Sequence, residues 1–299
     1  MTDPGLAAIR KHLAETNLNV ALPELRQWFD ALSSSFPTPG DVTVEPVRIA
    51  GRDCEIYSTP NAAADNLVIY FHGGGFALGS LRGYRHFASE LGRAAGARVL
   101  AVDYRLAPEH LYPAGIEDGV AAYRFALKQG ISPDRIAIMG DSAGASIALG
   151  SILAAHAADL PAPACAVCIS PWIDLTVTGA SMTSKASEDP FVTREGAIAS
   201  AQMYLNGADP RTSFAGPLHA DLSFLPAMLI QVGSAETLLD DAVRLAGVAG
   251  AAGVEVRLEI WSGMIHIWPF FYPTVKAGRK AIAQVGSFAR AAMAGTLAE

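Results

Sequence analysis

Short apolar runs rich in β-branched residues alternate with helical patterns along most of the chain. Segments 85–95, 115–128, 143–158 and 240–252 carry apolar residues at helical spacing. A chain that alternates strands with helices builds a mostly parallel sheet covered by helices on both faces. The sequence therefore predicts an α/β fold. The expected strands are residues 67–71, 98–104, 135–139, 165–170, 227–233 and 254–261.

Some segments depart from this alternation. The stretch "DVTVEPVRIAGRDCEIYSTP" alternates with period two around Gly51, which predicts an antiparallel hairpin at the sheet edge. Residues 1–35 predict two short amphipathic helices, and residues 176–212 are polar with one expected helix at 194–205. No repeat or linker divides the chain. We therefore expect a single domain, residues 1–299, with a helical cap formed by these two segments.

Composition limits the partners of the chain. Of its 299 residues, 51% are apolar and 17% are charged, as in a globular protein, and the net charge of −7 argues against nucleic acid and anionic lipid. The N-terminal sequence lacks the basic and then apolar pattern of a secretory signal. The uncharged stretch 143–158 is too short for a membrane span. We expect a soluble, cytoplasmic protein.

Cysteine usage agrees with a reducing compartment. Cys54, Cys165 and Cys168 are too few for a disulfide framework. The pair in "CAVC" lies within an expected strand, where residues i and i+3 face opposite ways. No second Cys/His pair stands at zinc spacing. We therefore expect structural cysteines, no metal and no cofactor.

The stretch "IAIMGDSAGASIALG" carries the clearest chemical signal. It predicts a strand, a sharp turn at Ser142 and a helix, and Gly140 and Gly144 flank the serine where strand and helix must approach closely. A serine exposed at such a turn is typical of a nucleophile. The N–H of Ala143 at the helix start then favours an oxyanion at the same point.

A glycine run follows the expected strand 67–71. In "FHGGGF" three glycines can bring backbone N–H groups close to one ligand oxygen, as an oxyanion hole requires. A phosphate-binding loop is the rival interpretation, but the Lys-Ser/Thr of such a loop is absent after the last glycine.

A serine nucleophile needs a base and an orienting carboxylate. Among seven histidines, His266 comes shortly after the strand 254–261, at the carboxyl edge of the sheet. The stretch "VGSAETLLDDA" after the strand 227–233 offers three carboxylates. The order serine, acid, histidine is the one used by nucleophile-elbow hydrolases. The candidate acids are Glu236, Asp240 and Asp241.

Four motifs in order carry a family resemblance: "HGGGF", "DYRLAPEHLYPA", "GDSAG" and "GMIH". With them the sequence resembles the α/β-hydrolase superfamily and, within it, the bacterial hormone-sensitive-lipase-like carboxylesterases. The resemblance implies hydrolysis of small to medium acyl esters through an acyl-enzyme on Ser142, with Gly74, Gly75 and Ala143 as oxyanion donors. It also implies that His72 braces the glycine loop.

The acid motif departs from the family pattern Asp-Pro-Leu-x-Asp. Glu236 stands at its first position and Asp240 at its last. We expect Glu236 to orient His266, because Asp240 falls at the start of the next helix, where an acid caps N–H groups and meets the helix dipole.

The sequence is also compatible with other functions. The same triad could cleave an aryl formamide or a small amide, and a hydrolase scaffold without activity could serve as a small-molecule receptor. A homodimer is a further expectation from the resemblance and from an unpaired edge strand at 254–261. Seven aromatic residues are equally compatible with pocket and with core: Trp28, Phe29, Trp172, Phe191, Tyr204, Trp268 and Phe270.

Overall fold

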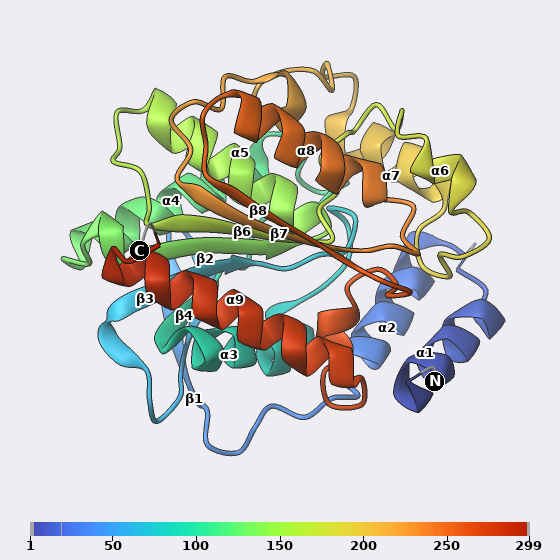
Figure 1. The fold of residues 1–299 in the computed structure, drawn as a ribbon, viewed down its shortest axis with the longest axis horizontal. Helices are drawn as coiled ribbons and strands as arrows, with labels where there is room; N and C mark the ends of the chain where they lie inside the picture. The colour runs from blue at the N-terminus through green and yellow to red at the C-terminus, as the bar shows by residue number, and fades with distance from the viewer. Residues whose placement is uncertain (1–2, 19, 298–299) are drawn as a thin grey trace.

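The computed structural model describes residues 3–18 and 20–297. Its centre is an eight-stranded sheet in the order β1-β2-β4-β3-β5-β6-β7-β8 (Figure 1). Strands β3 to β8 run parallel, whereas β2 pairs antiparallel with β4 and with β1. The predicted α/β fold and the edge hairpin are confirmed. The strands are β1 (Thr43–Ile49), β2 (Arg52–Ser58), β3 (Ala63–Phe71), β4 (Ala97–Ala101), β5 (Ile136–Asp141), β6 (Cys165–Ile169), β7 (Ala227–Gly233) and β8 (Val256–Trp261).

Helices cover both faces of this sheet (Figure 1). On one face α3 (Leu81–Ala95) and α9 (Lys276–Ala294) bury one apolar cluster, and on the other face α4 (Ala114–Lys128), α5 (Ala143–Ala157) and α8 (Leu239–Ala251) bury a second. The parallel strands are therefore apolar on both sides, which explains their continuous apolar runs in the sequence.

The cysteines follow this two-sided burial. Cys165 belongs to the cluster beneath α3 and α9, and Cys168 belongs to the opposite one. Both are buried and free, as is Cys54. The prediction that Cys165 and Cys168 face opposite ways is confirmed by this placement.

Helix α9 is the long element that the sequence analysis did not predict. It is rich in alanine and glycine, and its N-cap residue Val275 makes no side-chain cap hydrogen bond. A Cβ on Gly286 would strike the backbone of Ala94 in α3. The glycine thus permits close packing of the two helices, while it weakens the local helical signal.

The helices of the two proposed cap segments, α1 (Pro4–Glu15) and α2 (Leu22–Ser33) near the N-terminus and α6 (Ser181–Ser184) and α7 (Arg194–Leu205) within 176–212, lie together on one side of the molecule (Figure 1). Arg10 of the first helix donates to the carbonyl oxygens of Glu188 and Gly263, both at 3.0 Å. No helix among the described residues is long and apolar enough to cross a bilayer. The remaining helices are η1 (Pro133–Arg135), η2 (Pro217–His219) and η3 (Trp268–Phe271).

Candidate active site

Ser142 lies at the turn between β5 and α5 with φ 53° and ψ −125°, a conformation that a non-glycine residue rarely adopts. Its two flanking glycines leave room for this turn. A Cβ on Gly140 would strike the backbone of Gly144, and a Cβ on Gly144 would strike the carbonyl groups of Phe71 and His72. The turn therefore requires both glycines, as the sequence predicts.

The structure brings Ser142, His266 and Glu236 into one hydrogen-bonded row. His266 Nε2 lies 2.9 Å from Ser142 Oγ, and His266 Nδ1 lies 3.0 Å from Glu236 Oε2. The serine is 7% exposed, the histidine 2% and the glutamate 0%. A base within reach of a nucleophile, itself oriented by a carboxylate, is the arrangement that activates a serine.

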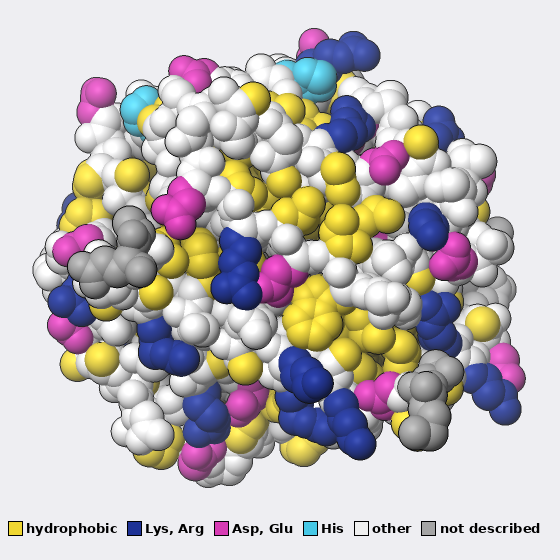
Figure 2. All heavy atoms as spheres, viewed as in Figure 1, with side chains coloured by type: hydrophobic (Ala, Val, Ile, Leu, Met, Phe, Trp, Pro, Cys, Tyr) yellow, Lys and Arg dark blue, Asp and Glu magenta, His cyan; other side chains and the backbone are white. Residues whose placement is uncertain are grey.

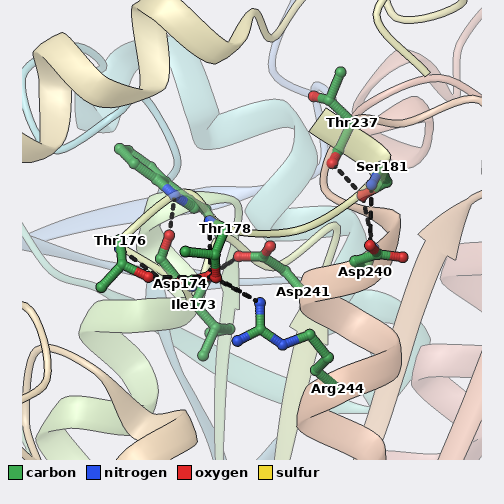
Figure 3. Close-up of polar contacts among 10 residues, drawn as sticks. Ile173, Asp174, Thr176, Thr178, Ser181, Thr237, Asp240, Asp241 and Arg244 are labelled. Atoms are coloured by element: carbon green, nitrogen blue, oxygen red, sulfur yellow. Dashed lines mark hydrogen bonds and ion pairs between the residues drawn. The ribbon is translucent and has the colours of Figure 1, made fainter. Parts of the chain in front are cut away.

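The other two candidate acids bond to the segment that follows β6 (Figure 3). Asp240 Oδ2 accepts the N–H of Ser181 at 2.9 Å, and the Ser181 hydroxyl accepts the N–H of Asp240 at 3.0 Å. Asp241 Oδ2 accepts the N–H groups of Ile173 and Asp174, both at 2.8 Å. Asp240 and Asp241 therefore fasten the segment after β6 to the start of α8.

Burial and pairing shift the titration of the buried row. Burial raises the pKa of Glu236, although its contact with His266 acts in the opposite direction. Burial also disfavours a charge on His266, but the hydrogen bond and the negative charge of Glu236 outweigh it and raise the pKa of the histidine above its ordinary value. A base with a raised pKa takes a proton from the serine more readily.

The glycine loop after β3 lies beside the serine. Gly74 and Gly75 have φ values of 123° and 60° and border the same cavity as Ser142. Ala143 is the first residue of α5, so its N–H has no acceptor within the helix. Gly74, Gly75 and Ala143, the predicted oxyanion donors, thus border or adjoin the serine. His72 Nδ1 lies 2.7 Å from the carbonyl oxygen of Gly73, and burial lowers the pKa of His72 to about 4, which keeps it neutral.

A buried carboxylate behind the loop was missed by sequence reasoning. Asp141 accepts hydrogen bonds from the N–H of Gly73 (3.0 Å) and from the hydroxyls of Tyr70 and Tyr84. Burial raises the pKa of Asp141 to about 6, against the effect of these donors. Its place next to Ser142 in "GDSAG" was the available signal. The contacts tie the glycine loop to the nucleophile turn.

A cavity of about 890 Å³ opens above Ser142 and His266. Residues of α1, α2, the segment 190–193 and α7 line it together with the glycine loop. Four of the seven singled-out aromatic residues border it, namely Trp28, Phe29, Trp172 and Phe191, whereas Tyr204, Trp268 and Phe270 are buried elsewhere. The described residues hold no group of three or more His, Cys, Asp or Glu side chains arranged for a metal ion.

Comparison with known proteins places this chain among hydrolases. The profile of the alpha/beta hydrolase fold family matches residues 68–270. The chain is 42% identical to an acetyl-hydrolase of Streptomyces hygroscopicus, covering 98% of both chains, and 37% identical to an esterase of Acinetobacter venetianus, covering 92% of this chain and 90% of the other. A crystal structure of an esterase from the bacterial hormone-sensitive lipase family matches with a TM-score of 0.95 at 41% identity, covering 98% of this chain and 99% of the other.

Proposed function

The chain belongs to the α/β-hydrolase fold family, among esterases of the bacterial hormone-sensitive-lipase family, and from that premise we propose that it is a serine carboxylesterase for small to medium acyl esters. It is a carboxylic ester hydrolase, so the silent-receptor alternative is set aside. The observation that carries the serine mechanism is the row Ser142 Oγ, His266 Nε2, His266 Nδ1 and Glu236 Oε2, with contacts of 2.9 and 3.0 Å.

Acylation begins when Ser142 Oγ attacks the ester carbonyl carbon and His266 Nε2 takes the hydroxyl proton. The carbonyl oxygen becomes an oxyanion, which the N–H groups of Gly74, Gly75 and Ala143 stabilise. Glu236 stabilises the imidazolium. The intermediate then collapses, the bond to the alcohol oxygen breaks, and His266 gives its proton to the departing alcohol.

Deacylation repeats these roles with water. His266 takes a proton from the water as its oxygen attacks the acyl carbon, and the second intermediate expels Ser142 Oγ, which recovers a proton from His266. The products are a carboxylic acid and an alcohol. Neither half-reaction needs a metal or a cofactor in this scheme.

The cavity supports the proposed substrate size. A volume of about 890 Å³ with mostly apolar walls suits a compact ester rather than a macromolecule. Phe191 packs against the ring of His266 (5.8 Å between centroids) and against Trp28 of α2 (6.3 Å). This contact joins the two proposed cap segments, residues 1–35 and 176–212, over the base.

A p-nitrophenyl ester series from acetate to decanoate, run beside a formanilide, tests substrate class and acyl length. The variant Ser142→Ala should lose several orders of magnitude in kcat while it stays folded. Intact-mass measurement after rapid quenching should show an acyl adduct on the parent chain and none on this variant. Retention of more than a few per cent of the activity by Ser142→Ala would exclude the serine mechanism.

The homodimer remains a proposal that rests on the sheet edge. β8 lies at the end of the sheet, and Ile260 on it is 51% exposed, while Val243 on the adjoining α8 is 41% exposed. Figure 2 shows apolar side chains around the centre of the face where Figure 1 places β8. An edge strand that exposes an apolar side chain such as Ile260 is a surface for pairing with a second copy.

A further inference from the structure

The last residue of β6 and the segment after it contact the backbone of Ser142 on both sides of Ser170. The N–H of Ser142 donates to the carbonyl of Ile169 at 2.9 Å, and the N–H of Trp172 donates to the carbonyl of Ser142 at 3.1 Å. Ser170, between these contacts, is 0% exposed. No role in the reaction scheme above uses this serine.

The hydroxyl of Ser170 joins the acid loop to the base loop. It donates to Glu236 Oε1 at 2.8 Å and accepts the N–H of Ile267 at 3.0 Å. Ile267 directly follows His266 in the chain. One oxygen atom therefore fixes the distance between the carboxylate and the backbone beside the base. Glu236 Oε1 also accepts the N–H of Gly233 at 2.5 Å.

The backbone at Ser170 is unusual for a serine. Its φ is 46°, in the left-handed region that glycine adopts without strain. The N–H of Ser170 donates to the carbonyl of Gln231 at 2.7 Å, which holds the residue in this conformation. The backbone alone would favour glycine, so the feature that serine adds here is its hydroxyl.

We propose that Ser170 is a positioning residue of the triad, whose hydroxyl keeps the Glu236 carboxylate ionised and in line with His266 Nδ1. The proposal rests on the proposed function, because it assigns Ser170 a part in orienting that triad. A hydrogen bond to the charged form of a carboxylate favours that form, and the same bond restricts rotation of the glutamate side chain. Ser170 acts through Glu236 and does not itself contact the substrate.

The test compares Ser170→Ala with Ser170→Gly. Both remove the hydroxyl, but glycine adopts a φ of 46° without strain, so Ser170→Gly should melt at a higher temperature than Ser170→Ala. Both should lower kcat for p-nitrophenyl butyrate about ten- to a hundredfold while KM stays within about twofold. The acid limb of the kcat/KM profile should move to higher pH, by roughly half a unit, because the ionised glutamate loses a donor.

Ser89→Ala is the matched control. Ser89 is a buried serine in α3, 1% exposed. Its hydroxyl donates to the carbonyl of His86, which is not a residue of the triad, at 3.0 Å. This variant should keep the parent kcat and the parent pH profile. It separates the loss of a buried hydroxyl in general from the loss of the one bonded to Glu236.

Two results would overturn the proposal. One is a Ser170→Ala variant with more than half of the parent kcat and an unmoved acid limb. The other is a Ser170→Gly variant that has both the stability and the kcat of the parent protein, which would make the role of Ser170 purely structural. Ser170→Gly alone decides the matter should the alanine variant fail to fold. Ser142→Ala and Glu236→Gln run in parallel, because activity in either would refute the triad itself rather than the role of Ser170.

Discussion

Glu236→Gln and Asp240→Asn, made as separate variants, distinguish the two carboxylates that the acid motif offers. In Glu236→Gln the side-chain oxygen should take the position of Oε1, because two donors, the Gly233 N–H and the Ser170 hydroxyl, converge there. The new NH₂ group then faces His266 Nδ1. A donor at that point fixes the histidine tautomer that carries its proton on Nε2, which cannot accept the proton of Ser142.

The expected loss is large because the whole row is buried. Neutralising the orienting acid of a buried triad costs on the order of a thousand- to ten-thousandfold in kcat, which corresponds to about 4 to 5.5 kcal/mol of transition-state stabilisation. Glu236 is 0% exposed, so solvent cannot replace its charge beside the imidazolium. KM should change little, since the side chain does not border the cavity.

Asp240→Asn should behave differently. Its amide oxygen can still accept the N–H of Ser181, so the variant loses mainly a negative charge at the start of α8. That loss costs about 0.5 to 1 kcal/mol of stability and leaves kcat within a few fold of the parent value. The measurements are kcat with p-nitrophenyl butyrate at pH 8 and a thermal melt of each variant. An inactive Asp240→Asn beside an active Glu236→Gln would refute the assignment of the acid.

Four further outcomes are expected. The kcat/KM profile should fall on acidification with a midpoint above the ordinary imidazole value of about 6.5, because only neutral His266 accepts a proton and its pKa is raised; a flat profile from pH 5 to 8 would contradict this. Trp28→Ala should raise kcat/KM for long acyl chains relative to acetate, because it enlarges the cavity. Deletion of residues 1–35 should alter the preference for acyl-chain length or abolish soluble activity. An unchanged chain-length preference with full activity would make that segment peripheral. Light scattering should give a dimer that Ile260→Lys converts to an active monomer, and a monomeric parent protein would refute the edge-strand interface.

The layers of the fold were predictable because their signal is local. Runs of apolar residues mark strands that are buried on both faces, and helical spacing marks the helices between them. Helix α9 escaped prediction although alanine favours helices, because Gly278 and Gly286 interrupt its pattern. Gly286 is explained by its close packing on α3, a contact between segments far apart in the chain.

The candidate site was predictable to the extent that its residues sit in short patterns. The elbow around Ser142 needs only its two neighbouring glycines, which the sequence displays. The carboxylate partner of His266 was harder to predict, because three carboxylates, at positions 236, 240 and 241, follow β7 closely in the chain. What separates Glu236 from Asp240 is the partner of each side chain, His266 for one and Ser181 for the other. Both partners are distant in sequence.

The acid loop also depends on the proposed cap segment 176–212. Asp189 accepts the N–H and the hydroxyl of Thr237, the residue after Glu236, at 2.9 and 3.0 Å, and its second oxygen accepts the N–H of Phe191 at 2.9 Å. The same carboxylate thus holds the loop of the acid and the ring that packs on His266. Because Asp189 bonds to both, the cavity wall at Phe191 and the loop of the proposed acid Glu236 form a single hydrogen-bonded unit. A pattern of residues in either segment alone carries no sign of this dependence.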